Sequence, residues 1–382
     1  MLNKRVRRLL ISLGALGIGE VLAGLTLQTS VEILTLYPVF LMLIPGLMDL
    51  RGDVYGALGY RLTTALHIGE AEAKVFSRYN FYNVLISYSV TTIASLIIAI
   101  LSYVISSSLG IESPGLLTLL FISMVSSTIV YVILTPVTTV SIILLFKTGR
   151  DPADFVASIV TGVGDALTPL TFITVSTLLH AIPHDVEAVV LIVLSALATI
   201  FALAVWKAGE LRTLLENTAS SVAASFGSSL GGLALATRTS VLARLPLILG
   251  SLPAFNALIG AGTGVLGNSL NVKLHLGVEN SLRKYVGDME NVAVATFTAI
   301  LLSMLVVSAL TLTSAHSVGL GVLIVGLSFS LLYTASSLLT FYLTQVSFKK
   351  GWNPDNLVFP LMTTFVDLNG PLIVSSIAGF FI

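Results

Sequence analysis

Two aspartates lie deep inside apolar sequence, and similar residues surround both of them. Asp165 belongs to the stretch 151–169, and Asp367 belongs to the stretch 353–371, which lies 202 positions later. At this offset a proline and a threonine before each aspartate, and a proline after it, also coincide. A carboxylate inside a membrane is costly, and it normally faces the interior of a helix bundle or a water-filled path. The two aspartates are therefore candidates for binding a cation or relaying a proton, with polar contacts between helices as the alternative.

Oxygen-bearing side chains share a helical face with each aspartate. If both stretches are helical, residues four, seven and eleven positions earlier lie on that face. The oxygen-bearing side chains at these positions are Thr161, Ser158 and Asp154 before Asp165, and Thr363 and Asn356 before Asp367. They predict a row of ligands that leads to each acid. Asp154 and Asn356 lie beside prolines near the helix starts, so helix capping is an equal interpretation for them.

The composition excludes a soluble protein. Hydrophobic residues make up 55% of the 382 residues and charged residues only 10%. Several uncharged apolar runs reach the roughly 20 residues that cross a membrane as a helix, and the alternation typical of membrane barrels is absent. A formal net charge of zero gives no basic field for nucleic acid. We therefore predict an all-α protein of the cell membrane, surrounded by the lipid bilayer and without a nucleic-acid partner.

The apolar runs predict about eleven transmembrane helices, and the basic residues support an odd number. If the first helix starts in the cytoplasm, 17 of the 19 Lys and Arg fall in cytoplasmic segments, and only Arg238 and Arg244 fall outside. This distribution predicts a cytoplasmic N-terminus, a retained first helix and an extracytoplasmic C-terminus. The predicted spans lie near residues 8–28, 33–50, 80–108, 116–146, 153–181, 186–206, 215–236, 246–266, 291–312, 319–346 and 354–381.

A sequence repeat extends beyond the two aspartate stretches. Shifted by 208 positions, the segment 45–69 overlays 253–277 with identical prolines, glycines and a histidine. The offset falls to 202 at the aspartates, as a loss of six residues from loops would produce. We therefore predict two parallel five-helix repeats joined by one linker helix. The predicted domains are 1–181 for the first repeat, 182–211 for the linker helix and 212–382 for the second repeat.

The first repeated segment places acids beside glycines. Gly52 precedes Asp53, and glycine allows the backbone to leave helical geometry or to approach another helix closely. Backbone carbonyls freed at such a break would suit a hard cation such as Mg²⁺, which prefers oxygen ligands and keeps several of its waters. The alternative is that the glycines serve helix packing and that Asp49 and Arg51 pair at the inner face. The second copy has Ala261 in the place of Asp53, so the expected site is asymmetric.

These motifs resemble those of the MgtE and solute carrier family 41 group of magnesium transporters. The marks are Pro45 followed by Gly52 and an acid in the first copy, and NPDN at 353–356 with Thr363 and Asp367 in the second. The resemblance covers nearly the whole chain, and its two-copy form is similar to the solute carrier branch. It implies that one chain does what a parallel dimer does in the bacterial branch. A monomer would then suffice as a pseudo-dimer, with a homo-oligomer left open.

The resemblance also implies a substrate and a site. The transported ion would be a divalent cation, chiefly Mg²⁺, with Mn²⁺ and other divalent ions left open. The mid-helix acids would hold it in a central path between the two copies, as a transported ion and not as a cofactor, and no catalytic residue is expected. The residues expected to bind or orient the ion are Asp165, Asp367, Asp53, Thr161, Thr363, Gly52, Asn356 and Asp154.

Two other functions remain open at the level of sequence. The same acids could form a sodium or proton site that drives the export of a cation. An intramembrane aspartyl enzyme would need the two acids about 3 Å apart and sharing a proton. The sequence contains no cysteine and neither an HExxH nor a GxSxG pattern, so an aspartyl pair is its one catalytic candidate.

Overall fold

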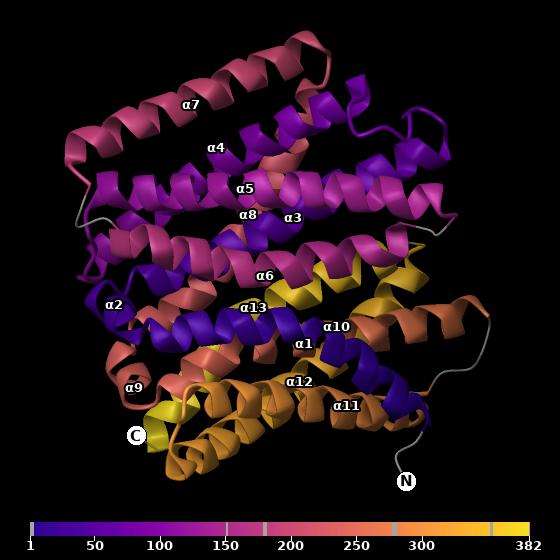
Figure 1. The fold of residues 1–382 in the computed structure, drawn as a ribbon. Coiled ribbons are helices and arrows are strands. Elements are labelled where there is room, and N and C mark those ends of the chain that lie inside the picture. Colours follow the sequence, from indigo (N-terminus) through magenta and orange to yellow (C-terminus); the bar gives the residue numbers. More distant parts are fainter. Residues whose placement is uncertain (1–3, 150–151, 179–181, 277–280, 352–353, 382) are drawn as a thin grey trace. The chain divides into compact units, whose positions relative to one another are not determined.

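The computed structural model describes residues 4–149, 152–178, 182–276, 281–351 and 354–381, and within these ranges it contains helices and no strand (Figure 1). Eleven of these helices have 24 or more residues. The long helices are α1 (Lys4–Thr29), α3 (Phe40–His67), α4 (Arg78–Ser108), α5 (Leu116–Lys147), α6 (Ala153–Leu178), α7 (His184–Lys207), α8 (Leu211–Ala236), α10 (Pro246–His275), α11 (Leu282–Leu310), α12 (Ala315–Lys349) and α13 (Pro354–Phe381). Two short helices are α2 (Val31–Leu36) and α9 (Thr239–Arg244).

Most of the long helices are suited to a membrane. In the described part of the chain, eight are long and apolar enough to cross one: α4, α5, α7, α8, α10, α11, α12 and the Leu361–Phe381 part of α13. The chain is therefore a multi-pass helical membrane protein, as the composition predicts. Each predicted span overlaps one long helix, but α1, α3 and α6 are not among the eight. A total of eleven membrane crossings stays a prediction.

The glycine-rich segment of the first copy is helical, and the predicted break at Gly52 is wrong. α3 runs without interruption from Phe40 to His67, through both Pro45 and Gly52. The predicted span 33–50 therefore starts later and extends much farther. A break in apolar surroundings would leave backbone N–H and C=O groups without partners, and this costs more than the roughly 1 kcal/mol by which glycine disfavours a helix. Gly52 consequently supplies no carbonyl freed by a break.

The helices form two compact units. The middle unit is Ile33–Thr237 and contains most of α2 and all of α3 to α8, and the terminal unit combines Met1–Glu32 with Arg238–Ile382 and contains α1 and α9 to α13. In the middle unit α8 packs on α3 and α4, and in the terminal unit α1 packs on α10 and α11. Each unit thus holds the first helix of the other predicted repeat. The predicted bounds 1–181, 182–211 and 212–382 describe sequence copies, and they stay a prediction at that level.

The same helix crossing occurs once in each unit. Gly24 of α1 lies against the backbone of Gly250 in α10, and Gly232 of α8 lies against the backbone of Leu41 and Met42 in α3. Gly232 follows Gly24 by 208 positions, and Gly250 follows Met42 by the same number. A side chain at either glycine of α1 or α8 would overlap backbone atoms, so glycine is what lets these helices approach so closely. The offset of the sequence repeat is therefore also the offset of a structural contact.

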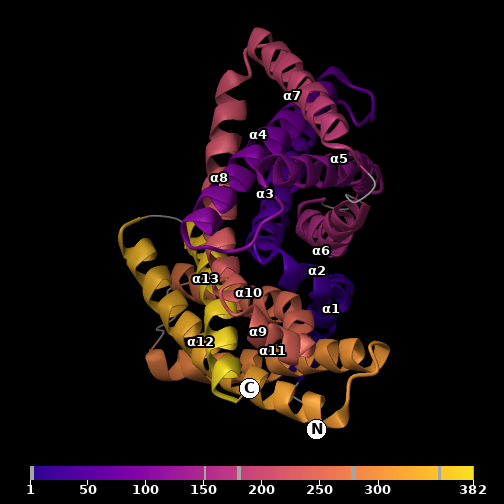
Figure 2. The same ribbon diagram turned by 90° about the vertical axis from the view of Figure 1, so that its left-hand side faces the viewer.

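The linker helix α7 lies along one edge of the middle unit. It packs on α4 and α5, and Figure 2 shows it beside them. Its apolar side chains are largely exposed, with Ile192 at 68% and Ile200 at 58%. An apolar helix with one packed face and one exposed apolar face is what lipid contact requires.

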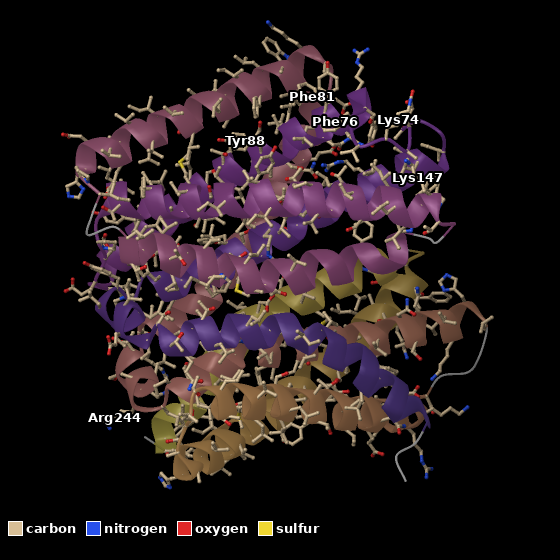
Figure 3. The ribbon with its side chains drawn as sticks, in the orientation of Figure 1. Lys74, Phe76, Phe81, Tyr88, Lys147 and Arg244 are labelled. Carbon is tan, nitrogen blue, oxygen red and sulfur yellow. The ribbon has the colours of Figure 1, made fainter. Side chains whose placement is uncertain are left out.

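Basic residues gather at one end of the middle unit. Lys74 lies in the loop between α3 and α4, and Lys147 is the last residue of α5. Figure 3 shows Lys74, Phe76 and Lys147 at the same end of that unit. The excess of basic residues predicts that this end faces the cytoplasm, and the orientation stays a prediction.

Candidate cation site

The middle unit pairs Asp165 with an arginine. Asp165 lies on α6 and is 6% exposed, and Arg51 lies on α3 and is 5% exposed. The Nη2 atom of Arg51 donates a hydrogen bond to Oδ1 of Asp165 and forms a buried ion pair with it. Removing one partner of such a pair leaves a buried charge at a cost of several kcal/mol, so the two residues depend on each other. Asp165 is therefore already in contact with a positive charge that belongs to the protein.

Gly164 makes room for this arginine. A side chain at position 164 would overlap the guanidinium and the Cδ atom of Arg51. In the second copy Val366 occupies the place of Gly164, and the uncharged Ile259 occupies the place of Arg51. Both are buried. The two positions thus change together, and this paired difference between the copies is the sequence signal that could have predicted the contact of Arg51 with α6.

Two further acids lie near the ion pair on α3. The Asp49 carboxylate accepts a hydrogen bond of 2.9 Å from Oγ of Ser228 on α8, and the charges of Arg51 and Asp165 both act on it. Asp53 lies one turn farther along α3 and is half-buried, close enough to Asp49 for the two carboxylates to repel each other. Arg51 is therefore paired with Asp165 and lies near Asp49, and Asp53 lies near Asp49.

The terminal unit places Asp367 on α13, where the side chain is half-buried. Thr363, one turn earlier, lies beside Gly260 of α10, because a methyl group on that glycine would lie 3.5 Å from Cγ2 of the threonine. Farther along α13, Gly370 lies against the side-chain amide of Asn256, also on α10. The helix that carries the acid in this unit therefore packs on α10, as α6 packs on α3 in the middle unit.

The structure places only some of the predicted site residues. Asp165, Asp53 and Gly52 belong to the middle unit, and Gly52 is half-buried with no atom within 4 Å of the position that a side chain would take. Within the described ranges, no group of three or more His, Asp or Glu side chains is arranged to hold a metal ion. The side chains of Thr161, Asp154 and Asn356 lie outside the described residues.

The two halves of the chain match one family model. The model describes divalent cation transporters under the name MgtE, and it matches residues 44–175 and 252–377. This chain belongs to the MgtE family of divalent cation transporters. Because the family consists of transporters and not of enzymes, the alternative of an intramembrane aspartyl enzyme is excluded. No curated protein and no solved structure matches the chain.

The MgtE match supports the duplication of the membrane domain. The two matched segments start 208 positions apart and end 202 positions apart, which are the two offsets of the repeat. The first segment contains Asp165 and the second contains Asp367. The helices α1, α7 and α8 lie outside both segments. The family match therefore covers α3 to α6 and α10 to α13 and is silent about the first helix of each predicted repeat.

Proposed function

We propose that this chain transports divalent cations, chiefly Mg²⁺, and that each sequence copy supplies one central acid to the cation path, Asp165 and Asp367. The family match supports a divalent cation as the substrate class. The observation that carries the assignment to these residues is the recurrence of a mid-helix aspartate inside both matched segments. Acids in membrane helices are rare and usually mark an ion pathway.

The ion pair with Arg51 changes the role of Asp165. In this proposal the Oδ1 atom stays on the guanidinium, and the second carboxylate oxygen accepts a hydrogen bond from the water shell of the cation. Mg²⁺ gives up its waters reluctantly, so contact through water is the natural way for it to pass a partly neutralised acid. In this proposal the ionised forms of Asp49 and Asp53, which lie on the same helix as Arg51, offset the repulsion between Arg51 and the cation.

The other expected ligands orient the waters of the ion. In this proposal Asp53 and Thr363 act through hydrogen bonds to those waters, and the open space beside Gly52 leaves room for them. Thr161, Asp154 and Asn356 are assigned the same role from their shared helical faces alone. None of them needs to contact the metal directly.

Uptake of Mg²⁺ by proteoliposomes tests the proposed function. The purified chain is reconstituted with a magnesium-sensitive dye inside the vesicles, and the variants are Asp367→Asn and the double variant Arg51→Gln with Asp165→Asn. The double variant is used because Asp165→Asn alone would leave the Arg51 charge without its carboxylate. We expect each to reduce the uptake rate about tenfold or more, the loss typical when a group that acts through a metal's outer shell is removed. Asp185→Asn, which alters an exposed acid at the start of α7, is the matched control and should keep the parental rate.

Two results would contradict this proposal. Parental protein that moves no divalent cation, in either direction and at any tested gradient, would exclude the transport function. Variants as active as the parent would remove Asp165 and Asp367 from the path. Repeating the assay with an imposed sodium or proton gradient separates a channel from a coupled exporter, because only the exporter changes its rate of Mg²⁺ transport with the gradient of the coupling ion.

A further inference from the structure

A buried acid on α1 lies outside the segments that the family match covers. Glu20 is 1% exposed and is the only acid in α1, which packs on α10 and α11 of the terminal unit. A carboxylate this deeply buried in a membrane helix requires a reason, since its charge is costly there. The comparison of the two units provides that reason.

The helix crossing described above shows which residues correspond to Glu20. Gly24 on α1 and Gly232 on α8 make the same close approach at an offset of 208, and Glu20 lies one turn before Gly24. The same offset relates Glu20 to Ser228 on α8, and it relates Asp49 on α3 to Ala257 on α10. The pair Ser228 and Asp49 in the middle unit thus corresponds to the pair Glu20 and Ala257 in the terminal unit.

The helix that carries the carboxylate differs between the two units. In the middle unit α3 supplies the acid and α8 supplies a hydroxyl, and the two are joined by the hydrogen bond between Ser228 and Asp49. In the terminal unit α1 supplies the acid, and α10 has only the methyl group of Ala257 at the corresponding position. A small residue opposite a long acid leaves space for the longer side chain. The crossing therefore carries one carboxylate in each unit.

We propose that Glu20 is a residue of the cation path, and that it provides in the terminal unit the negative charge that Asp49 provides in the middle unit. The ion on which Glu20 acts is a hydrated divalent cation, the substrate class of the proposed function, on which this inference rests. What matters is the carboxylate at the helix crossing and not the helix that supplies it.

Moving the acid between helices tests this inference. Glu20→Gln keeps the size of the side chain and removes its charge, and we expect it to reduce Mg²⁺ uptake by proteoliposomes about tenfold. Glu20→Ser should have a similar effect. The double variant Glu20→Ser with Ala257→Asp rebuilds the Ser228 and Asp49 arrangement in the terminal unit, and it should recover most of the parental rate. Glu32→Gln, the same chemical change at an exposed acid of α2, is the matched control.

The outcomes separate this inference from the proposed function. If the parent transports Mg²⁺ and Glu20→Gln transports it equally well, Glu20 is not in the path while the proposed function stands. If Glu20→Ser loses uptake and the added Ala257→Asp fails to restore it, although both proteins elute as monodisperse particles, the equivalence is wrong. The stabilisation of the protein by Mg²⁺ against thermal unfolding is a second measurement that does not depend on flux. It should weaken in Glu20→Gln and return in the double variant.

Discussion

Asp165 and Asp367 are the same residue in two sequence copies, yet their units surround them differently. In the middle unit, Asp165 is buried against Arg51, and Gly164 leaves space for the guanidinium. In the terminal unit the corresponding positions hold Ile259 and Val366, two buried apolar residues. Two differences occur together: the apolar Ile259 replaces the charged Arg51, and the larger Val366 replaces Gly164, which leaves room for the guanidinium.

This contrast shows what a duplicated transporter can vary and what it keeps. Arg51 adds a positive charge to one unit, and Asp49 and Asp53 are present there where the other unit has Ala257 and Ala261. The positive charge of Arg51 therefore comes with two acids on the same helix, and the terminal unit has neither the base nor those acids at the corresponding positions. A duplicated membrane domain can thus change the charges of one copy as a set while the central aspartate is kept in both.

The largest expected effect comes from removing the guanidinium. Arg51→Ile copies the terminal unit at one position and leaves Asp165 buried without its ion-pair partner. We expect the free energy of unfolding, measured by titrating mixed micelles with denaturing detergent, to fall by about 3–5 kcal/mol. Adding Asp165→Asn to Arg51→Ile should recover most of the loss, since no charge then remains at the pair. Equal stability of the single and double variants would show that Asp165 does not depend on Arg51.

A smaller loss is expected when the space for the arginine is filled. Gly164→Val copies Val366 and pushes the Arg51 side chain aside without removing its charge, which should cost about 1–3 kcal/mol. The variant with both Arg51→Ile and Gly164→Val, measured in the same titration, should be more stable than the two single effects predict, by roughly 0.5–3 kcal/mol of coupling. Strictly additive effects would mean that the residues vary independently between the copies.

The sequence predicts the helices well, because apolar length alone determines most of them. The run that starts at Pro354 was predicted to end at residue 381, as α13 does. The glycine segment was predicted less well. Glycine favours a break in water, but the buried, apolar surroundings of α3 keep it helical from Phe40 to His67. Local preference was a poor guide at this point because the surroundings outweigh it.

The candidate site could be predicted in part. Residues that share a helical face can be read from their spacing, and the two aspartates can be read from their recurrence in the repeat. The partner of Asp165 could not be found by spacing, since Arg51 lies 114 positions away on another helix. The packing of α1 with α10 was also not foreseeable from chain order, because neighbouring helices usually pack together. The contact of Arg51 with α6 is indicated only when the differences between the copies are read in pairs.

The helix crossings offer a test in which the two units should behave alike. Gly24→Ala and Gly232→Ala each place a methyl group into the backbone of the facing helix, and each should lower the free energy of unfolding by about 1–2 kcal/mol. Gly56→Ala is the control, because no atom lies within 4 Å of the position that its methyl group would take, and it should be neutral or slightly stabilising. A large difference between the first two variants would indicate that the crossings are not equivalent.

The smallest expected effect concerns two histidines that the units treat identically. His67 contacts the ring of Phe146 edge-on at 5.3 Å and its Nδ1 atom lies 2.8 Å from the carbonyl oxygen of Thr63. His275 repeats this with Phe348 at 4.9 Å and an Asn271 carbonyl oxygen at 3.0 Å. Both histidines end their helices and lie outside the proposed path.

Replacing either histidine should therefore affect stability and leave transport unchanged. We expect His67→Ala and His275→Ala each to lower the free energy of unfolding by about 0.5–1.5 kcal/mol, the range for an edge-on aromatic pair. Mg²⁺ uptake, corrected for the amount of folded protein, should stay at the parental rate in both. A loss of uptake in only one of them would show that the asymmetry between the units extends beyond the acids to the helix ends. If neither variant changes Mg²⁺ uptake, the asymmetry between the units is confined to the residues around Asp165 and Asp367.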